Sequence, residues 1–278
     1  MALTLGDYLL KHSTIPDKEG LGMDITDVVA EKPLLWKDEP SQLIRISASV
    51  DWSIKTVEVN IFSVNSEGRK TVDHARCRVK FGRSEEWLAE WKRHAYLVKD
   101  RIQRMQKNVH DDSESAILVK RGMFYKLFSS VVEYSDLFKG HQEVILQSNE
   151  LEAVGRVKFQ ATEKDGKYFL SPYWIDSIGQ LSGFVMNAND TVDSRSQVFM
   201  NHGWESMRCA KPFSSAKTYQ TYVKMQPVGK NMYAGDVHVF DDGEIIAIYQ
   251  GIRVCFSALY LDTPSDFFYS SKEYRGIC

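Results

Sequence analysis

The feature that most constrains this chain is the stretch 172–189, Pro-Tyr-Trp-Ile-Asp-Ser-Ile-Gly-Gln-Leu-Ser-Gly-Phe-Val-Met-Asn-Ala-Asn. Its apolar residues recur at helical spacing and Pro is tolerated at helix starts, so a mostly buried helix is predicted over 173–187. The same spacing places Asp176, Gln180 and Asn187 along one stripe. Such a stripe on a buried helix faces either a cavity or a satisfied polar network. The simplest alternative is a core helix capped by Asp176, which is expected in its first turn.

Charge and composition give no reason to expect nucleic acid or an anionic membrane surface as a partner. The 35 Lys and Arg residues nearly balance the 37 Asp and Glu residues, for a net charge of −2. No apolar run approaches the ~20 residues of a membrane span. The first residues lack the basic region and small-residue cleavage site of a signal peptide. A cytoplasmic location is therefore the default expectation.

The four cysteines, Cys77, Cys209, Cys255 and Cys278, are scattered and include no C-x-x-C pair. This spacing favours free thiols in a reducing compartment over disulfides or a zinc site. No metal site is expected.

Hydrophobic periodicity predicts two runs of strands, each headed by a helix. The predicted helices are 2–12, 84–107, 121–134 and 173–187. The predicted strands are 24–32, 42–52, 56–64, 70–81, 142–147, 150–161, 167–171, 196–201, 204–210, 217–226, 231–240 and 244–256. Hairpin turns are expected at Ser66-Glu67-Gly68 and at Asp241-Asp242-Gly243.

This order predicts an α+β double hot-dog fold, in which two antiparallel sheets are each wrapped around a central helix. The helices near 2–12 and 173–187 would be the two central ones. We expect a first hot-dog unit at 1–115 and a second at 116–278.

Several motifs, in this order, resemble the product-template domain of fungal non-reducing polyketide synthases over residues 1 to about 253. They are Asp7-Tyr-Leu, Asp24-Ile-Thr-Asp-Val-Val with Lys32-Pro-Leu, Trp87-Leu-Ala-Glu-Trp-Lys-Arg-His-Ala-Tyr-Leu-Val, Gly122-Met-Phe-Tyr-Lys-Leu-Phe, Tyr173-Trp-Ile-Asp-Ser-Ile-Gly-Gln-Leu-Ser-Gly-Phe, His202-Gly-Trp-Glu-Ser-Met-Arg, Thr218-Tyr-Gln-Thr-Tyr-Val-Lys-Met-Gln-Pro and Tyr233-Ala-Gly-Asp-Val. Each motif alone is weak, but their number and order make the match specific.

The resemblance implies two fused hot-dog folds around one deep chamber. A carrier protein delivers a poly-β-ketone thioester on its phosphopantetheine, and no metal or other cofactor is needed. A His of the first unit acts as base, and the Asp paired with it matches Asp176, with Gln180 as its companion. Neighbouring polyketide synthase domains are the implied partners, and homodimer formation is left open.

The chain departs from the family at both ends. The family's catalytic His precedes the first hot-dog helix, whereas this chain opens inside what resembles that helix. None of the seven histidines sits in the family's catalytic motif. We therefore expect an N-terminally truncated product-template domain whose first hot dog is incomplete, with an unpaired strand edge. Whether the isolated chain is an enzyme is left open.

The remaining candidate substrate-binding residues are Tyr173, Phe184, Asn187 and His202. Aromatic residues at helical spacing more often pack in a core, and a His beside a strand is more often structural. Two other function classes stay open. One is a hot-dog acyl thioesterase or dehydratase, in which a helix N-terminus polarises the thioester carbonyl. The other is a non-catalytic module that binds an acyl chain or carrier protein.

Overall fold

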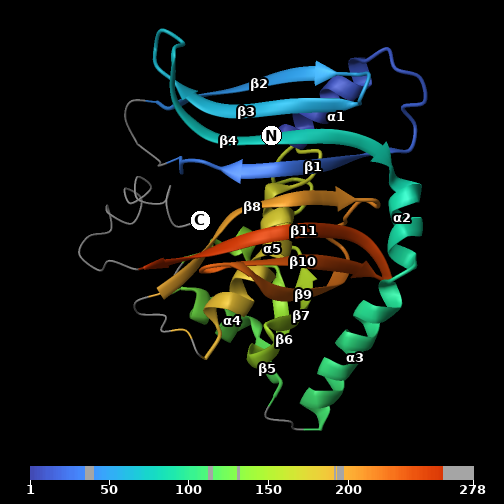
Figure 1. The fold of residues 1–278 in the computed structure, drawn as a ribbon, viewed down its shortest axis with the longest axis vertical. Helices are drawn as coiled ribbons and strands as arrows, with labels where there is room; N and C mark the ends of the chain where they lie inside the picture. Colours follow the sequence, from blue (N-terminus) through green and yellow to red (C-terminus); the bar gives the residue numbers. More distant parts are fainter. Residues whose placement is uncertain (35–40, 112–114, 130–131, 191, 193–196, 259–278) are drawn as a thin grey trace.

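The computed structural model describes residues 1–34, 41–111, 115–129, 132–190, 192 and 197–258. Its strands form one antiparallel sheet of eleven strands in the order β2-β3-β4-β1-β8-β11-β10-β9-β7-β6-β5 (Figure 1). The strands are β1 (Leu21–Ala30), β2 (Leu43–Asp51), β3 (Thr56–Val64), β4 (Lys70–Arg83), β5 (Ile117–Lys120), β6 (His141–Gln147), β7 (Glu152–Lys158), β8 (Gln197–Cys209), β9 (Thr218–Gly229), β10 (Met232–Asp241) and β11 (Glu244–Ala258).

The first four strands and helix α1 (Ala2–His12) form one unit of the molecule. Helix α1 lies across β1 and β4 and buries Leu3 and Gly6. A Cβ atom at Gly6 would lie 2.9 Å from the Met23 sulfur and 3.1 Å from Val79 Cγ1, so only glycine allows the helix this close to the sheet. Tyr8, on the other side of the helix, is exposed.

The outermost strand of that unit, β2, pairs only with β3 among the described strands. Leu43, Ile44 and Ile46 on β2 are exposed. The expectation of an unpaired strand edge in the first unit therefore agrees with the described part of the sheet.

The other seven strands curve around helix α5 (Pro172–Asn187). The predicted central helix is confirmed, with bounds within one residue. Ile178, Leu181 and Val185 of α5 are fully buried among apolar residues of β7, β9, β10 and β11. Two units run side by side through the β1–β8 pairing, which joins them into one sheet. The predicted boundary between the two units, after residue 115, stays a prediction.

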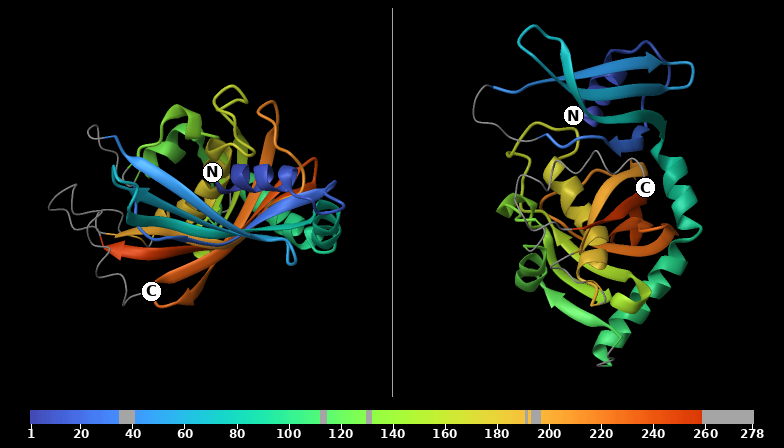
Figure 2. Two further views of the ribbon diagram at one scale, coloured as in Figure 1. Left: turned by 90° about the horizontal axis from the view of Figure 1, so that it is seen from above. Right: turned by 60° about the vertical axis from the view of Figure 1, so that its left-hand side comes forward.

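Helices α2 (Ser84–Lys92) and α3 (Ala95–His110) cover the side of the strands opposite α5 (Figure 2). Prediction of a single helix over 84–107 was wrong, because the chain kinks at His94. Arg93 and His94 bond to carbonyls three residues back instead of four. The apolar spacing continues through the kink, with Trp87, Trp91, Ala95, Ile102 and Met105 all buried.

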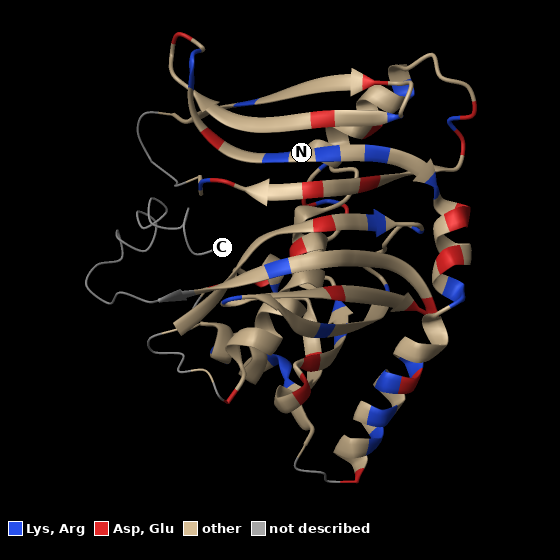
Figure 3. Ribbon diagram, viewed as in Figure 1, with Lys and Arg blue, Asp and Glu red and all other residues tan. Residues whose placement is uncertain are grey.

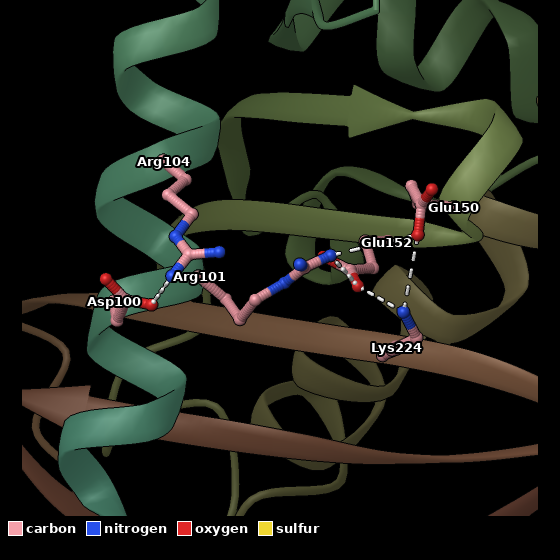
Figure 4. Close-up of polar contacts among 6 residues, drawn as sticks. All are labelled: Asp100, Arg101, Arg104, Glu150, Glu152 and Lys224. Carbon is pink, nitrogen blue, oxygen red and sulfur yellow. Dashed lines mark hydrogen bonds and ion pairs between the residues drawn. The ribbon is translucent and has the colours of Figure 1, made fainter.

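A buried ion pair fixes α3 to the sheet (Figure 4). The Glu152 side chain on β7 is fully buried and accepts from Arg101 of α3 at 2.5 and 3.2 Å. Lys224 of β9 donates to the same carboxylate at 2.6 Å. Elsewhere acidic and basic residues are interspersed along the helices and strands (Figure 3).

Four predicted elements differ from the structure, namely the helix 121–134 and the strands 167–171, 196–201 and 204–210. Helix α4 (Arg121–Phe128) ends before the predicted 134, and residues 130 and 131 lie outside the described part. Residues 167–171 form no strand, and the predicted pair 196–201 and 204–210 is the single strand β8. Two short 3-10 turns, η1 (Asp136–Phe138) and η2 (Ser148–Glu150), complete the elements.

The expectation of free thiols is confirmed for two of the cysteines and is wrong for a third. Cys77 and Cys209 are free thiols, whereas Cys255 is disulfide-bonded. Spacing along a sequence does not reveal which sulfur atoms meet in space, which is why this bond was missed. None of the helices in the described residues is long and apolar enough to cross a membrane.

Candidate functional site

A cavity of about 710 Å³ opens where α5 faces β8 and β11. Its volume falls in the range of small-molecule sites. The walls are mostly apolar, and polar side chains enter from both α5 and β8. The lining residues are Phe128, Val132, Tyr134, Pro172, Ile175, Asp176, Gly179, Gln180, Ser182, Gly183, Asn187, Phe199, Met200, Asn201, Trp204, Tyr249, Ile252 and Val254.

Asp176 lies in the cavity wall on the second turn of α5, because the helix begins at Pro172. Its expected place in the first turn was wrong, and so was its reading as a cap. The carboxylate oxygen Oδ2 instead accepts a hydrogen bond of 2.7 Å from Gln180 Nε2, one turn further along. The i, i+4 spacing that suggested a shared face also makes this bond.

Gln180 is held by a network that reaches to neighbouring elements. Its Nε2 also donates to the Phe138 carbonyl at 3.0 Å, and its Oε1 accepts from the Tyr125 hydroxyl at 3.1 Å. The Tyr125 oxygen in turn accepts from the backbone N–H of His141 at 3.0 Å. A carboxylate held by a locked partner keeps one orientation in the cavity, as functional side chains require.

Burial raises the pKa of the Asp176 carboxyl above its usual range, and the Gln180 hydrogen bond only partly opposes this shift. Water therefore stabilises the charged form poorly here. A positive group that enters the cavity beside Asp176 would gain more from this carboxylate than it would in bulk water.

Asn187 also lines the cavity, but its amide is already occupied. Its Nδ2 donates to the Phe199 carbonyl at 3.0 Å, and its Oδ1 accepts from the Phe199 N–H at 2.8 Å. Asn187 therefore ties the end of α5 to the start of β8 and shapes the cavity.

Three predicted residues are not among those that line this cavity. Phe184 is fully buried and stacks on Phe124 with ring centroids 4.2 Å apart. It lies about 80° around the helix from Asp176 at ~100° per residue, so its side chain enters the core. Tyr173 packs edge-on against Phe138, and His202 lies on β8, where burial lowers its pKa.

The sequence reasoning missed five aromatic residues of the cavity, which are Phe128, Tyr134, Phe199, Trp204 and Tyr249. Three of them lie on strands, where local sequence patterns do not reveal which face meets α5. None of the seven histidines, all in the described residues, lines the cavity. Across the described part of the chain, no three His, Cys, Asp or Glu side chains gather as a metal site.

Comparison with known proteins identifies the family. Residues 104–255 match the family described as polyketide synthase dehydratase N-terminal domain. The chain is 51% identical over 253 residues to a non-reducing polyketide synthase of Byssochlamys spectabilis, covering 91% of this chain and 12% of that protein. It is 48% identical over 259 residues to the conidial pigment polyketide synthase alb1 of Aspergillus fumigatus, covering 93% and 12%. The chain thus spans about an eighth of these relatives.

Solved structures support the same fold. The dehydratase domain from the CurK module of curacin polyketide synthase superposes with a TM-score of 0.64 at 17% identity, over 92% of this chain and 81% of that one. The dehydratase domain of PpsC from Mycobacterium tuberculosis gives 0.65 at 12% identity, over 93% and 81%. The predicted hot-dog architecture is confirmed. The chain belongs to the polyketide synthase dehydratase family and corresponds to the product-template region of fungal non-reducing polyketide synthases.

Proposed function

We propose that this chain directs the aldol cyclisation and aromatisation of a poly-β-ketone thioester held on the phosphopantetheine of an acyl carrier protein. The observation that carries the proposal is the Asp176 carboxylate, fixed by Gln180 in the wall of a largely apolar cavity. The partners would be the carrier protein and adjoining domains of a cytosolic synthase. The proposal includes no metal or redox cofactor, because the aldol reaction involves no net oxidation or reduction and a general base can remove the acidic proton between two ketones.

The chemistry suits such a site. A proton between two ketones is already acidic, so a neutral imidazole can remove it. A carboxylate beside that imidazole fixes its tautomer and stabilises the cation that forms. The cavity walls would hold the chain in one conformation, so that a single pair of carbons meets.

The proposal assigns Asp176 the support of an imidazole base, as the family resemblance implies. Because no histidine among the described residues lines the cavity, the proposal takes this base from a part of the synthase beyond the 278 residues. Two structural neighbours fit this chemistry. The CurK dehydratase is described as inactive when one Asp is replaced by Asn, and also when one His is replaced by Phe.

The test is the product profile of a synthase that contains this chain, given its carrier-bound substrate. We expect Asp176→Asn to remove the enzyme-directed ring pattern and to leave products of spontaneous cyclisation. The exposed Asp136, which pairs with Lys139, supplies the matched control Asp136→Asn. An unchanged ring pattern in Asp176→Asn would contradict the proposed role.

A second comparison tests where the base comes from. The 278-residue chain and a chain extended at its N-terminus are each given the same carrier-bound substrate. We expect directed cyclisation only from the extended chain. A single directed ring pattern from the 278-residue chain alone would show that another residue supplies the base.

Dehydration of a β-hydroxyacyl thioester is the second candidate function, favoured by the family match and by the dehydratase neighbours. Incubation with a β-hydroxyacyl thioester and with a simple acyl thioester separates the alternatives. Loss of water from the first indicates a dehydratase, and hydrolysis of the second indicates a thioesterase. Binding of both without turnover indicates a non-catalytic module.

A further inference from the structure

Two hydrogen-bond donors in the cavity have no partner among the described residues. The Tyr249 hydroxyl on β11 is buried and unpaired, and the residue is only 2% exposed. The indole Nε1–H of Trp204 on β8 is also buried and unpaired. Native proteins rarely bury polar groups without a partner, and tyrosine and tryptophan usually find one. Both residues line the cavity that holds Asp176.

The two donors come from neighbouring strands. Strands β8 and β11 pair with Tyr249 opposite Met207 and Arg253 opposite Gly203. Trp204 lies on β8 between Gly203 and Met207, so it is beside the segment of β11 that begins at Tyr249. Burial raises the pKa of the Tyr249 hydroxyl well above its ordinary value, and the nearby Cys209 and the Asp176 carboxylate raise it further. The hydroxyl thus keeps its proton and can donate.

A bulge in β11 orients this part of the strand. Between Tyr249 and Ile252 the strand advances three residues, while the partner strand β10 advances two, from Val237 to Gly235. Residues three apart face opposite sides of a regular strand, yet Tyr249 and Ile252 both line the cavity. Bulges often redirect side chains beside active sites.

Gly251 supplies the conformation that the bulge needs. Its φ is +58°, in the left-handed region that favours glycine. Its N–H donates to the Asp236 carboxylate at 2.8 Å, which holds the bulge in place. A Cβ atom here would lie 2.6 Å from the Glu205 carboxyl carbon. The backbone is thus built to present Tyr249 to the cavity.

We propose that the Tyr249 hydroxyl and the Trp204 indole N–H bind the ketone oxygen that is attacked in the cyclisation. This inference rests on the proposed function and names the electrophilic half of that site. The base takes a proton from the methylene between two ketones, and the resulting enolate carbon bonds to the ketone carbon. The π electron pair of that C=O moves to oxygen, and the two donors stabilise the alkoxide. The base then gives its proton to the alkoxide and returns to its neutral form.

The donor set also defines a substrate class. A ketone oxygen carries lone pairs and no proton, so it can accept a hydrogen bond from both the Tyr249 hydroxyl and the Trp204 indole N–H. The base that Asp176 supports and these two donors then act on different parts of one β-polyketone, the acidic methylene and the accepting carbonyl. Donors aimed at a developing oxyanion contribute strongly to acyl and carbonyl chemistry because they are already oriented.

The first experiment observes the hydrogen bond itself. The 278-residue chain is saturated with acetoacetyl-pantetheine labelled with ¹³C at the ketone. We expect the bound ketone signal to move downfield, because donation to the oxygen withdraws electron density from the carbon. Tyr249→Phe and Trp204→Phe should each reverse part of this shift. The control Tyr222→Phe removes a buried hydroxyl on the α3 side of the sheet and should leave the shift unchanged.

The second experiment measures directed cyclisation in a synthase that contains the chain. Removal of a single oxyanion donor lowers rates by about 10²–10³-fold in other enzymes, and we expect a loss of this order for Tyr249→Phe. Thermal melting checks the fold of each variant. If Trp204→Phe does not fold, Tyr249→Phe alone carries the test.

The outcomes separate this inference from the proposed function. If Asp176→Asn abolishes the directed ring pattern while Tyr249→Phe keeps both the rate and the ¹³C shift, the donor assignment is overturned and the proposed function stands. If Asp176→Asn has no effect, the proposed function fails, and the ¹³C shift still decides whether Tyr249 binds a ketone. An unshifted ketone signal in the saturated wild-type chain overturns the assignment.

Discussion

Gln180 donates its side-chain amide to the Asp176 carboxylate at 2.7 Å, one turn along α5, and does so at the wall of the cavity. The remaining bonds of the Gln180 side chain reach the Phe138 carbonyl and the Tyr125 hydroxyl. Gln180 therefore holds the Asp176 carboxylate in one orientation, and buried hydrogen bonds hold Gln180 itself. Such an arrangement favours function at some cost in stability, since a buried charge is expensive.

The first prediction concerns that cost. The folded-state pKa of Asp176 is raised above 3.8, so its contribution to stability is fully present below pH 3.8 and is lost as pH rises through the folded pKa. At pH 7 the buried charge therefore destabilises the fold. We expect Asp176→Asn to raise the free energy of unfolding at pH 7 by about 0.5–2 kcal/mol, the common gain at such sites. Urea unfolding at pH 7 and pH 4 measures it.

The gain should shrink towards pH 4, where the wild-type carboxyl approaches its neutral form. Asp136→Asn, at an exposed carboxylate, is again the control. A variant less stable than wild type at pH 7 would mean that the charged form of Asp176 is favoured by the fold, against the direction of its pKa shift.

The second prediction removes the partner. Gln180→Leu leaves the Tyr125 hydroxyl and an Asp176 oxygen without the bonds they have now. Each unsatisfied buried group costs about 1–3 kcal/mol, so we expect a loss of that order in urea unfolding. The pKa of Asp176 should rise further, since the lost bond favours its charged form. A ¹³C titration of the carboxyl measures it, with exposed Gln106→Leu as control.

The helix α5 and its polar stripe could be predicted from the sequence because helical periodicity alone sets which residues share a face. Asp176, Gln180 and Asn187 lie in the cavity wall for this reason. The hairpin at Asp242-Gly243 was also predictable, since its turn needs positive φ at both residues, and both have it (+48° and +79°).

The rest of the site depends on tertiary structure that local patterns do not encode. Trp204 and Tyr249 reach the cavity through the packing of two strands against α5, and a bulge at Gly251 changes the face on which nearby residues lie. Phe184 is close enough to the stripe to suggest a cavity, but the Phe124 ring packs against it. The kink at His94 leaves the apolar spacing of α2 and α3 unbroken, so periodicity could not reveal it.

The third prediction concerns the Glu152 ion pair (Figure 4). Its carboxylate is fully buried, whereas Arg101 and Lys224 are each about one-third exposed (36% and 35%). Arg101→Met or Lys224→Met alone leaves one cation on the carboxylate and should cost about 1–2 kcal/mol, less than an unpaired buried charge. The double variant leaves the buried Glu152 carboxylate with no cation and, among the described residues, only the Tyr222 hydroxyl as a hydrogen-bond partner. We expect a loss of about 3–5 kcal/mol, more than the two single losses together.

Urea unfolding of the two single variants and the double variant tests this coupling. Arg104→Met is the control, because Arg104 forms an exposed i, i+4 pair with Asp100 on the same helix, and such pairs contribute only about 0.3–0.5 kcal/mol. Strictly additive losses would show that Glu152 finds another partner or water once both cations are gone.

The last prediction uses His141, which lies beneath the same polar network. Its ring is fully buried against Phe124, and burial lowers its pKa from 6.5 to about 3. The unfolded chain binds a proton near pH 6.5 while the folded chain does not, so stability is lost as pH falls from about 6.5 towards 3. This one residue should contribute up to about 1.4 kcal/mol of loss per pH unit. We expect His141→Leu to flatten the fall in urea midpoint between pH 7 and pH 5, whereas exposed His110→Leu should not. If the pH dependence of His141→Leu matches that of wild type, the imidazole is already protonated in the fold or reaches solvent, and its buried neutral state is wrong.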